Sequence, residues 1–456
     1  MKILLKCPSR SRPQQLLATL RRYADMAARL DLMGVVVSCD VDDPTMTGSD
    51  IQQQLFQVMS RFAWNSLYYG GSATKIEACN ADIDKVDYPW DLVVLVSDDM
   101  IPEVRGYDNH IRQAARPDLD CIVWFNDGFQ GYRLNTLSIY GRVMYERLGC
   151  IYHPVYKSFY CDTELTDLCK TTYRDKTVYN DTCIIRHKHP LLGHAVAFDS
   201  LYMRNNKYLE EDLRTYISRK IYEYDLSILI PTLVERRPQC ERLKATLREQ
   251  FARLCPGLRL EILEALDNRE MSVGMKRRNL LEAAKGKYTV FIDDDDSVND
   301  AYFEDFLTCF NAKDDVMRIR GQMSNHTFTH SIANPLNGRM YVDGVFVRPP
   351  NHLNPMLANI AKLVNFEDAT RGEDLKWTID IAKTGFLRSE TRSDPTRIHY
   401  NYNIGGRTVD ARAIDYQQKH TYEEWVKILL MPATPAKKPE PKTAGLRLTS
   451  RGFVSK

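Results

Sequence analysis

Four consecutive carboxylates, Asp293 to Asp296, follow the run of β-branched and aromatic residues from Tyr288 to Ile292. Such an apolar run predicts a buried strand. Four adjacent like charges repel one another unless a cation lies among them. An acidic run is often only a solvated turn, but the segment Asp91 to Met100 contains a second apolar run that ends in Asp98 and Asp99. We infer that the chain contains two copies of the same feature, an apolar strand that ends in adjacent carboxylates.

Carboxylates at a strand end suit a hard divalent cation. Mg²⁺ and Mn²⁺ take one or two protein carboxylates and complete their coordination with water or phosphate oxygens. This chemistry favours a phosphate-bearing substrate such as a nucleoside diphosphate sugar, whose leaving diphosphate the metal would neutralise as a Lewis acid. The expected metal ligands of the strand ends are Asp293, Asp295 and Asp296 in the second half and Asp98 and Asp99 in the first.

An acceptor hydroxyl also needs a base, and that base must come from a different part of the chain because it faces the sugar from the side opposite the metal. In the second half we expect Asp374, with Glu373 beside it. In the first half the candidates are Glu164 and Asp162.

Each half has a histidine at the same distance beyond its candidate base. His189 follows Glu164 by 25 positions, and His399 follows Asp374 by 25 positions. Either histidine could complete the metal coordination or contact the diphosphate, and a structural role is the equally open alternative. The matched interval supports an internal duplication.

The elements that must position these side chains also occur twice in the same order. An opening strand leads to Pro8 and Ser9, a helix is expected from about Gln14 to Leu30, and the next strand ends at Asp40. At Leu226 the pattern restarts. Strand, helix and strand in this rhythm predict a parallel α/β sheet with functional groups at the carboxyl ends of the strands.

A nucleotide would meet the turn after each opening strand, the carboxylate that ends the next strand, and the helix before each acidic strand. Any one of these residues could equally be a surface charge or a turn residue. The expected nucleotide-binding residues are Pro8, Ser9, Asp40, Lys75 and Asn80 in the first half, and Pro231, Thr232, Asp267, Lys276, Arg278 and Asn279 in the second.

A chain of 456 residues with 44% hydrophobic content is too long for one ordinary core. We expect domains over 1–222 and 226–431 and a mobile basic tail over 432–456. The eleven cysteines include no C-x-x-C pair, which favours reduced thiols in the cytoplasm. No apolar run approaches the length of a membrane span, and Lys6 and Pro8 interrupt any signal peptide.

The second half, from Leu226 to Met431, resembles an inverting family 2 glycosyltransferase of the GT-A fold. The resemblance lies in the opening LSILIPT, Asp267-Asn268, the helix GMKRRN, the acidic run in place of the family's D-x-D element, and Gly372 to Asp374 in place of its base motif. It implies that Asp293 and either Asp295 or Asp296 bind metal and that Asp374 is the base. The first half resembles the same fold more distantly.

These observations together predict two tandem GT-A domains of the α/β class, with one transferase site in each. The expected cofactors are Mn²⁺ or Mg²⁺ and a nucleoside diphosphate sugar, with a UDP-sugar favoured. The acceptor is a saccharide or glycoconjugate, or alternatively a hydroxylated base of DNA, which the basic tail would suit. One active domain with a non-catalytic binding module is a further alternative. A two-metal nuclease or polymerase would leave the nucleotide-sugar elements unexplained.

Overall fold

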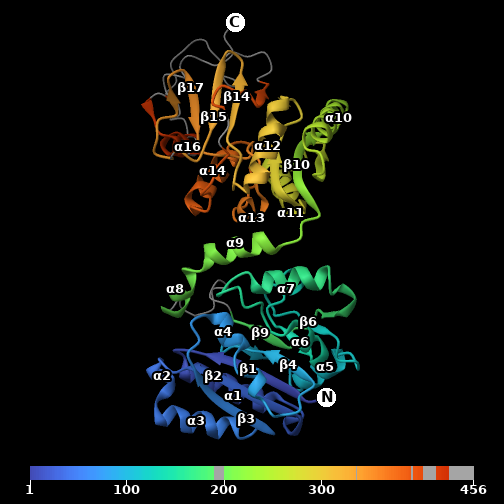
Figure 1. Cartoon of the computed structure of the whole chain (residues 1–456), viewed down its shortest axis with the longest axis vertical. Coiled ribbons are helices and arrows are strands. Elements are labelled where there is room, and N and C mark those ends of the chain that lie inside the picture. The colour runs from blue at the N-terminus through green and yellow to red at the C-terminus, as the bar shows by residue number, and fades with distance from the viewer. Residues whose placement is uncertain (189–199, 335, 392–393, 404–416, 418, 431–456) are drawn as a thin grey trace, which may run out of the picture. The chain divides into compact units, whose positions relative to one another are not determined.

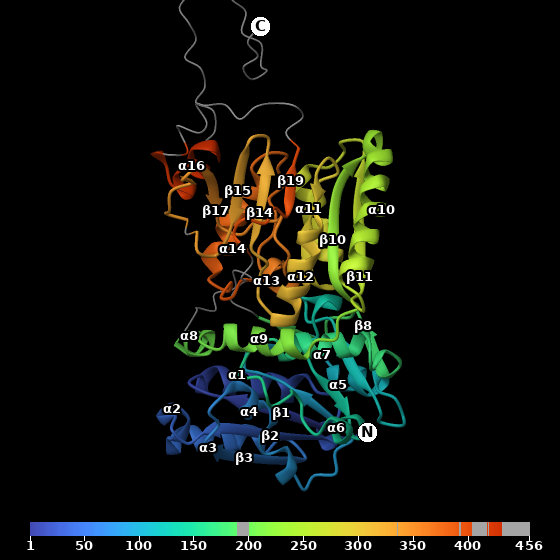
Figure 2. The same cartoon turned by 45° about the horizontal axis from the view of Figure 1, so that its top comes forward.

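The chain forms two compact units in the computed structural model, Met1–Ile221 and Tyr222–Lys456 (Figure 1). The structure describes residues 1–188, 200–334, 336–391, 394–403, 417 and 419–430. His189 and the expected tail over 432–456 lie outside the described residues. Each unit is an α/β structure with its own sheet (Figures 1 and 2).

A seven-stranded sheet forms the centre of the first unit, in the order β3-β2-β1-β4-β7-β6-β8. Its strands are β1 (Ile3–Ser9), β2 (Met33–Asp40), β3 (Trp64–Gly70), β4 (Leu92–Leu95), β6 (Ile122–Phe125), β7 (Ile139–Gly141) and β8 (Thr177–Asn180). β1 pairs in parallel with both β2 and β4, and β7 is antiparallel to its two neighbours. The mostly parallel sheet predicted from the sequence is therefore confirmed.

The helices of the first unit mostly connect these strands. They are α1 (Pro13–Met26), α2 (Pro44–Thr47), α3 (Ser49–Met59), α4 (Lys75–Asn80), α5 (Tyr107–Ala114), α6 (Arg142–Leu148), α7 (Cys161–Lys170), α8 (Ser200–Asn206) and α9 (Leu209–Arg219). A short antiparallel pair, β5 (Met100–Pro102) and β9 (Ile185–His187), completes the unit. The helix expected to reach Leu30 ends at Met26, because the Asp108 carboxylate accepts hydrogen bonds from the N–H groups of Ala28 and Arg29.

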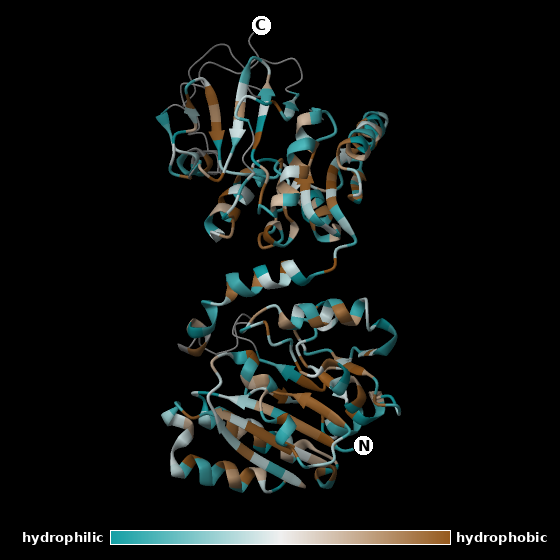
Figure 3. Ribbon diagram, viewed as in Figure 1, coloured by the Kyte–Doolittle hydropathy of each residue, from teal (hydrophilic) through white to brown (hydrophobic). Residues whose placement is uncertain are grey.

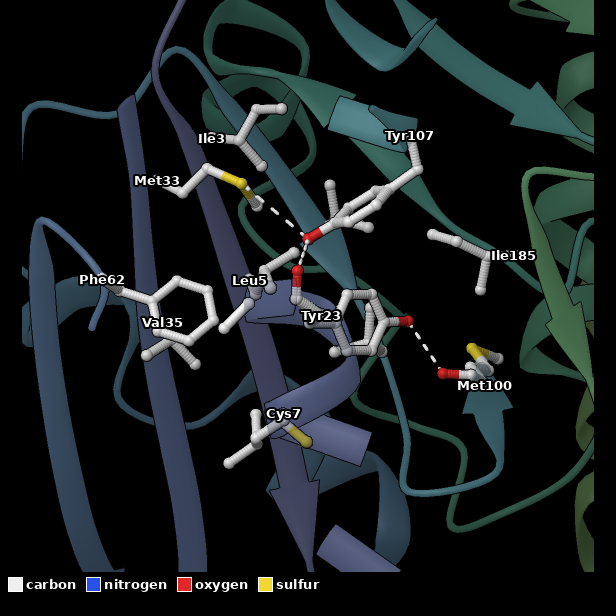
Figure 4. Packing of buried hydrophobic residues seen from close by; sticks show 14 of the residues in the cluster. Ile3, Leu5, Cys7, Tyr23, Met33, Val35, Phe62, Met100, Tyr107 and Ile185 are labelled. Carbon is white, nitrogen blue, oxygen red and sulfur yellow. Dashed lines mark hydrogen bonds between the residues drawn. The ribbon is translucent and has the colours of Figure 1, made fainter. Parts of the chain in front are cut away.

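The core of the first unit lies on both faces of its sheet. Alternate residues of β1 enter two different clusters, Ile3 and Leu5 on one face and Leu4 on the other. Figure 3 shows these central strands in brown, the colour of hydrophobic residues. In the first cluster the Tyr23 hydroxyl donates to the Met100 carbonyl at 2.9 Å, and the Tyr107 hydroxyl donates to the Tyr23 carbonyl at 3.2 Å (Figure 4). The polar tips of these buried rings are thus satisfied.

The second unit contains two sheets. The first has the order β11-β10-β12-β18 and the second β13-β19-β14-β15-β17-β16. The strands are β10 (Tyr224–Leu233), β11 (Leu260–Asp267), β12 (Gly286–Phe291), β13 (Ser297–Val298), β14 (Ile319–Met323), β15 (His326–His330), β16 (Tyr341–Val342), β17 (Val345–Arg348), β18 (Met356–Leu357) and β19 (Tyr400–Tyr402). β10 is parallel to β11 and β12, so the three strands end at the same edge.

Helices α10 and α12 pack against each other, and α11 packs on β10 and β11. The helices of the second unit are α10 (Arg237–Leu254), α11 (Val273–Ala283), α12 (Asp300–Ala312), α13 (Ala358–Ala361), α14 (Glu373–Thr384) and α16 (Tyr422–Leu430). Phe251 of α10 meets Phe303 of α12 edge to face, with ring centroids 5.5 Å apart. No helix within the described ranges is long and apolar enough to cross a membrane. All eleven cysteines are free thiols.

Gly274 allows a close approach between α11 and the segment that precedes α14. A Cβ atom built on Gly274 would lie 1.9 Å from the carbonyl oxygen of Glu367. The Gly274 N–H donates to the carbonyl of Ala369 at 2.9 Å. This contact fixes the position of α11, which carries the cationic side chains described below.

We predict that Gly274→Ala destabilises the second unit by roughly 1–3 kcal/mol, since overpacking forces the backbone apart. Alanine has a higher helix propensity than glycine, so the change in helix propensity alone would stabilise α11. Thermal unfolding of the full chain tests this. Gly70→Ala is the control, because nothing lies within 4 Å of a Cβ built there. Equal unfolding temperatures for the two variants would contradict the prediction.

Candidate active site

The acidic run lies at the carboxyl edge of the parallel strands of the second unit. β10 continues past the end of β12, so that Leu233 pairs with Asp267 of β11 while Leu229 pairs with Phe291 of β12. The residues after Phe291 therefore run beside the exposed end of β10. The Thr232 hydroxyl accordingly donates to Asp294 at 2.6 Å.

Alternate carboxylates of the run have different surroundings. Asp294 is buried and also accepts a hydrogen bond from Arg236 at 2.8 Å. Asp296 is buried and accepts from the Tyr400 hydroxyl and the Asn403 N–H, each at 2.7 Å. The side chains of Asp293 and Asp295 keep 26% and 35% of their surface exposed. The two carboxylates that can reach a ligand are therefore two residues apart.

Arg277 joins this run to the beginning of α14. Its Nη2 lies 3.1 Å from a carboxylate oxygen of Asp293, and its Nε lies 3.5 Å from a carboxylate oxygen of Glu373. The guanidinium is buried over the ring of Phe291, 5.3 Å from the centroid. Its Nε and Nη1 make no hydrogen bond to any described residue. Arg277 thus connects the acidic run with the beginning of α14, two segments that are distant in the sequence.

Asp374 is the accessible carboxylate of the first turn of α14, because 29% of its side chain is exposed while Glu373 is buried. The turn is set by Gly372, which precedes the helix with a φ of 78°, a conformation suited to glycine. Nδ1 of His352 lies 4.0 Å from Asp374. Burial and the charge of Arg277 lower the pKa of His352 well below its usual value, so this imidazole is neutral.

Negative charge is in excess at this edge. Burial and the neighbouring carboxylates, Asp295 and Asp374 foremost, raise the pKa of Asp293 despite Arg277. Burial raises the pKa of Asp296 to about 7. Burial also raises the pKa of Glu373. Such a site gains free energy from an added cation.

The donor set of Asp293 and Asp295 fits Mg²⁺ or Mn²⁺. Both cations prefer carboxylate oxygen and accept few protein ligands when phosphate oxygens are present. Within the described part of the chain, no group of three or more His, Cys, Asp or Glu side chains could hold a metal ion by itself. The remaining ligands would therefore be water or substrate oxygens. A cavity of about 220 Å³ adjoins the run on the side of α10.

The expected nucleotide-binding residues of the second half separate into two groups. Lys276 pairs with the Asp267 carboxylate and donates to the Thr232 backbone carbonyl at 2.8 Å, so these three residues lie together at the strand ends. Pro231 lies half-buried on β10 beside them. Arg278 and Asn279 lie elsewhere: Arg278 donates to the carbonyl of Phe366 at 2.9 Å, and Asn279 is exposed. Arg277, one position earlier on α11, faces the acidic run instead of Arg278 and Asn279.

His399 is not available as a metal ligand. Its Nδ1 accepts a hydrogen bond from the Arg320 N–H at 2.9 Å, and its Nε2 lies 2.7 Å from a carboxylate oxygen of Asp305. Since Nδ1 is the acceptor, Nε2 carries the proton and donates it. The side chain is fully buried and joins β14, α12 and β19.

In the first unit, a pocket of about 500 Å³ opens at the carboxyl ends of β1, β2 and β4. It gathers most of the residues expected there. Pro8, Ser9, Asp40, Lys75, Asp98, Asp99 and Asp162 all line it. His187 lines it as well, with Nε2 3.7 Å from Asp99, and was missed because its neighbour His189 has the matched spacing.

Two candidates of the first unit have structural roles. Glu164 is held by Arg219 of α9 at 2.7 Å and does not line the pocket. Asn80 donates to the Tyr152 carbonyl at 2.7 Å and accepts from the N–H groups of Ile151 and Tyr152 at 3.0 Å. Asp162 is thus the acidic residue of α7 that faces the pocket.

The comparisons with known proteins give structural matches alone, since no family model and no curated protein sequence matches the chain. A mannosyltransferase from Pyrobaculum calidifontis in complex with GDP-Man and Mn²⁺ is 14% identical, with a TM-score of 0.37 over 48% of this chain and 65% of that one. A glucosyl-3-phosphoglycerate synthase from Mycobacterium tuberculosis in complex with Mg²⁺ and UDP is 12% identical, with a TM-score of 0.34 over 49% of this chain and 82% of that one.

A Drosophila β-1,4-galactosyltransferase 7 mutant in complex with manganese, UDP-Gal and xylobiose is 13% identical, with a TM-score of 0.28 over 44% of this chain and 79% of that one. The two transferases and the synthase named above are three of the solved structures that this chain resembles. The matched region is about half of this chain and just under two thirds of the mannosyltransferase.

We predict that His399→Ala lowers the free energy of unfolding by about 1–3 kcal/mol, because Asp305 loses a buried hydrogen-bond donor. Manganese affinity, measured by calorimetric titration, should stay within error of the unsubstituted protein. His110→Ala, at an exposed position of α5, serves as the control for both measurements. A selective loss of manganese binding in His399→Ala would contradict the prediction and would indicate that His399 is a metal ligand.

The raised pKa of Asp296 predicts a pH dependence of stability. The folded state holds this proton up to about pH 7, whereas the unfolded chain releases it near the ordinary value of 3.8. The resulting stabilisation is complete below pH 3.8 and is lost as the pH rises through about 7. In chelator, thermal unfolding of the full chain should show this decline, and Asp296→Asn should flatten it. An unchanged slope in the variant would refute the assignment.

Proposed function

We propose that the second unit transfers a sugar from a nucleoside diphosphate sugar to an acceptor hydroxyl. One observation carries the proposal. Arg277 contacts both Asp293 of the acidic run and Glu373 at the beginning of α14, and so brings the accessible Asp374 next to Glu373 to the same edge from a distant segment. A metal site and a base on separate elements are what such a transfer needs.

Asp293 and Asp295 would hold the divalent cation, which supplies Lewis-acid stabilisation of the departing diphosphate. Asp374 takes the proton from the acceptor hydroxyl as its oxygen bonds to the anomeric carbon. The bond from that carbon to the diphosphate oxygen breaks, and its electron pair leaves with the diphosphate. Neutral His352 lies beside Asp374 and adds no positive charge there. A single displacement of this kind inverts the anomeric centre.

We further propose that each unit has its own ligand site, because the first unit places the corresponding strand ends around a pocket of its own. The eleven free thiols support action in a reducing compartment such as the cytoplasm. A saccharide or glycoconjugate is the proposed acceptor, and a hydroxylated DNA base is the alternative that mass spectrometry of the products would reveal. UDP- and GDP-sugars with Mn²⁺ or Mg²⁺ are the donors to test first.

Nucleotide-sugar hydrolysis by the full chain tests the proposal without a known acceptor. We expect turnover that depends on Mn²⁺ and falls by about 10²-fold or more in Asp374→Asn, since a general base typically contributes that much. Asp295→Ala should abolish the stimulation by Mn²⁺. Asp300→Asn, a surface carboxylate paired with Arg253, is the matched control. Equal rates in the Asp295→Ala variant and the control would exclude this site.

A further inference from the structure

The pocket of the first unit differs in charge from the acidic edge of the second. Its described lining contains four carboxylates, Asp40, Asp98, Asp99 and Asp162, and four permanent cations, Arg10, Arg12, Lys75 and Arg204. The charges of these described lining residues therefore balance before any ligand enters. A divalent cation gains little free energy in a site whose carboxylates are already compensated.

The paired carboxylates that follow β4 are engaged by side chains of the same unit. Nη1 of Arg12 lies 3.2 Å from Oδ1 of Asp98. Asp99 accepts a hydrogen bond from the Ser97 hydroxyl and lies 3.7 Å from Nε2 of His187. All four of the ionisable groups in these contacts keep less than a fifth of their side-chain surface exposed. Asp98 and Asp99 thus do not fit the metal-binding role that the sequence predicts for them.

Arg236 offers the comparison within the same chain. It also follows the opening strand of its unit and contacts the acidic run, at 2.8 Å from Asp294 and 3.2 Å from Asp295. Its side chain is 44% exposed, however, while that of Arg12 is 11% exposed. Arg236 can swing into water when a cation arrives. Arg12 is packed in place. Arg277 beside Asp293 is packed in place as well, but the second unit retains Asp295, whose partner Arg236 is exposed.

Other groups of the pocket suit a phosphate-bearing ligand. Lys75 and Arg204 enter from α4 and α8. The buried Ser9 hydroxyl, at the end of β1, has no hydrogen-bond partner among the described residues and could donate to a phosphate oxygen. Phe129 and Tyr160 add aromatic surface for a base or sugar. A volume of about 500 Å³ lies within the range of small-molecule pockets.

We propose that the pocket of the first unit binds a nucleoside diphosphate, free or as its sugar ester, without a divalent cation. Arg12, Lys75 and Arg204 supply the positive charge for the diphosphate that a divalent cation would otherwise bring. The chain then has two nucleotide sites, and only the site of the second unit requires a divalent cation. This inference does not rest on the proposed activity of the second unit, since the first pocket is built from residues of its own unit.

Calorimetric titration of UDP and GDP into the full-length Asp295→Ala protein tests the proposal, because that substitution removes the expected metal site of the second unit. We expect the better of the two nucleotides to bind with the same affinity in EDTA and in Mn²⁺. Adding Arg12→Gln should weaken binding in EDTA by about tenfold or more, as expected for the loss of a charge-assisted hydrogen bond. Mn²⁺ should then restore part of the affinity, since Asp98 is released from Arg12.

Arg29→Gln in the same background is the matched control, because Arg29 pairs with Asp31 on the exposed surface of the same unit. If Arg12→Gln does not fold, Lys75→Ala takes its place, with weaker binding in EDTA expected. The proposal is overturned by binding that requires Mn²⁺ in the Asp295→Ala background, by unchanged affinity in the Arg12 or Lys75 variant, or by failure of both nucleotides to bind. The difference between unsubstituted and Asp295→Ala protein reports the second unit separately.

Discussion

The crowding of carboxylates at the carboxyl edge of a parallel sheet is the constraint on which the second unit depends. Side chains that lie this close together cannot all be ionised unless the surrounding structure compensates them. Thr232 and Arg236 hold Asp294, whereas Tyr400 and the backbone of residue 403 hold Asp296. These partners come from β10, from the segment before α10 and from β19. The second sheet is thereby tied to the first through the charges at their junction.

The two units compensate the crowded carboxylates at their strand ends in different ways. The first unit compensates its strand-end carboxylates with cations of the same unit, among them the largely covered Arg12, and the charges of the described pocket lining balance. The second leaves Asp293 and Asp295 partly exposed beside a cluster whose pKa values are raised. A repeated backbone layout therefore does not imply repeated chemistry. The difference lies in the exposure of one arginine after each opening strand, 11% for Arg12 and 44% for Arg236.

The sequence predicts features that depend on local pattern. The opening strands, the strand-end carboxylates and the parallel pairing of β1 and β10 with their neighbours follow from apolar runs and from their order along the chain. The sequence does not predict which neighbour on a helix faces inward, so Arg278 was expected where Arg277 lies. Nor does it predict partners distant in the chain. Asp305 engages His399 and Arg219 engages Glu164, and both pairings arise from tertiary packing.

The strand orders bear on how the chain folds. In each unit the first strand in sequence, β1 or β10, lies between the next strands of the parallel core. β10 cannot be paired on both sides until the ribosome has delivered the chain as far as Phe291, and β1 must wait for Leu95. Contacts of such long sequence separation form slowly, and unpaired apolar strands are prone to aggregate. Nascent chains of this protein should therefore be clients of chaperones that cover β1 and β10 during synthesis.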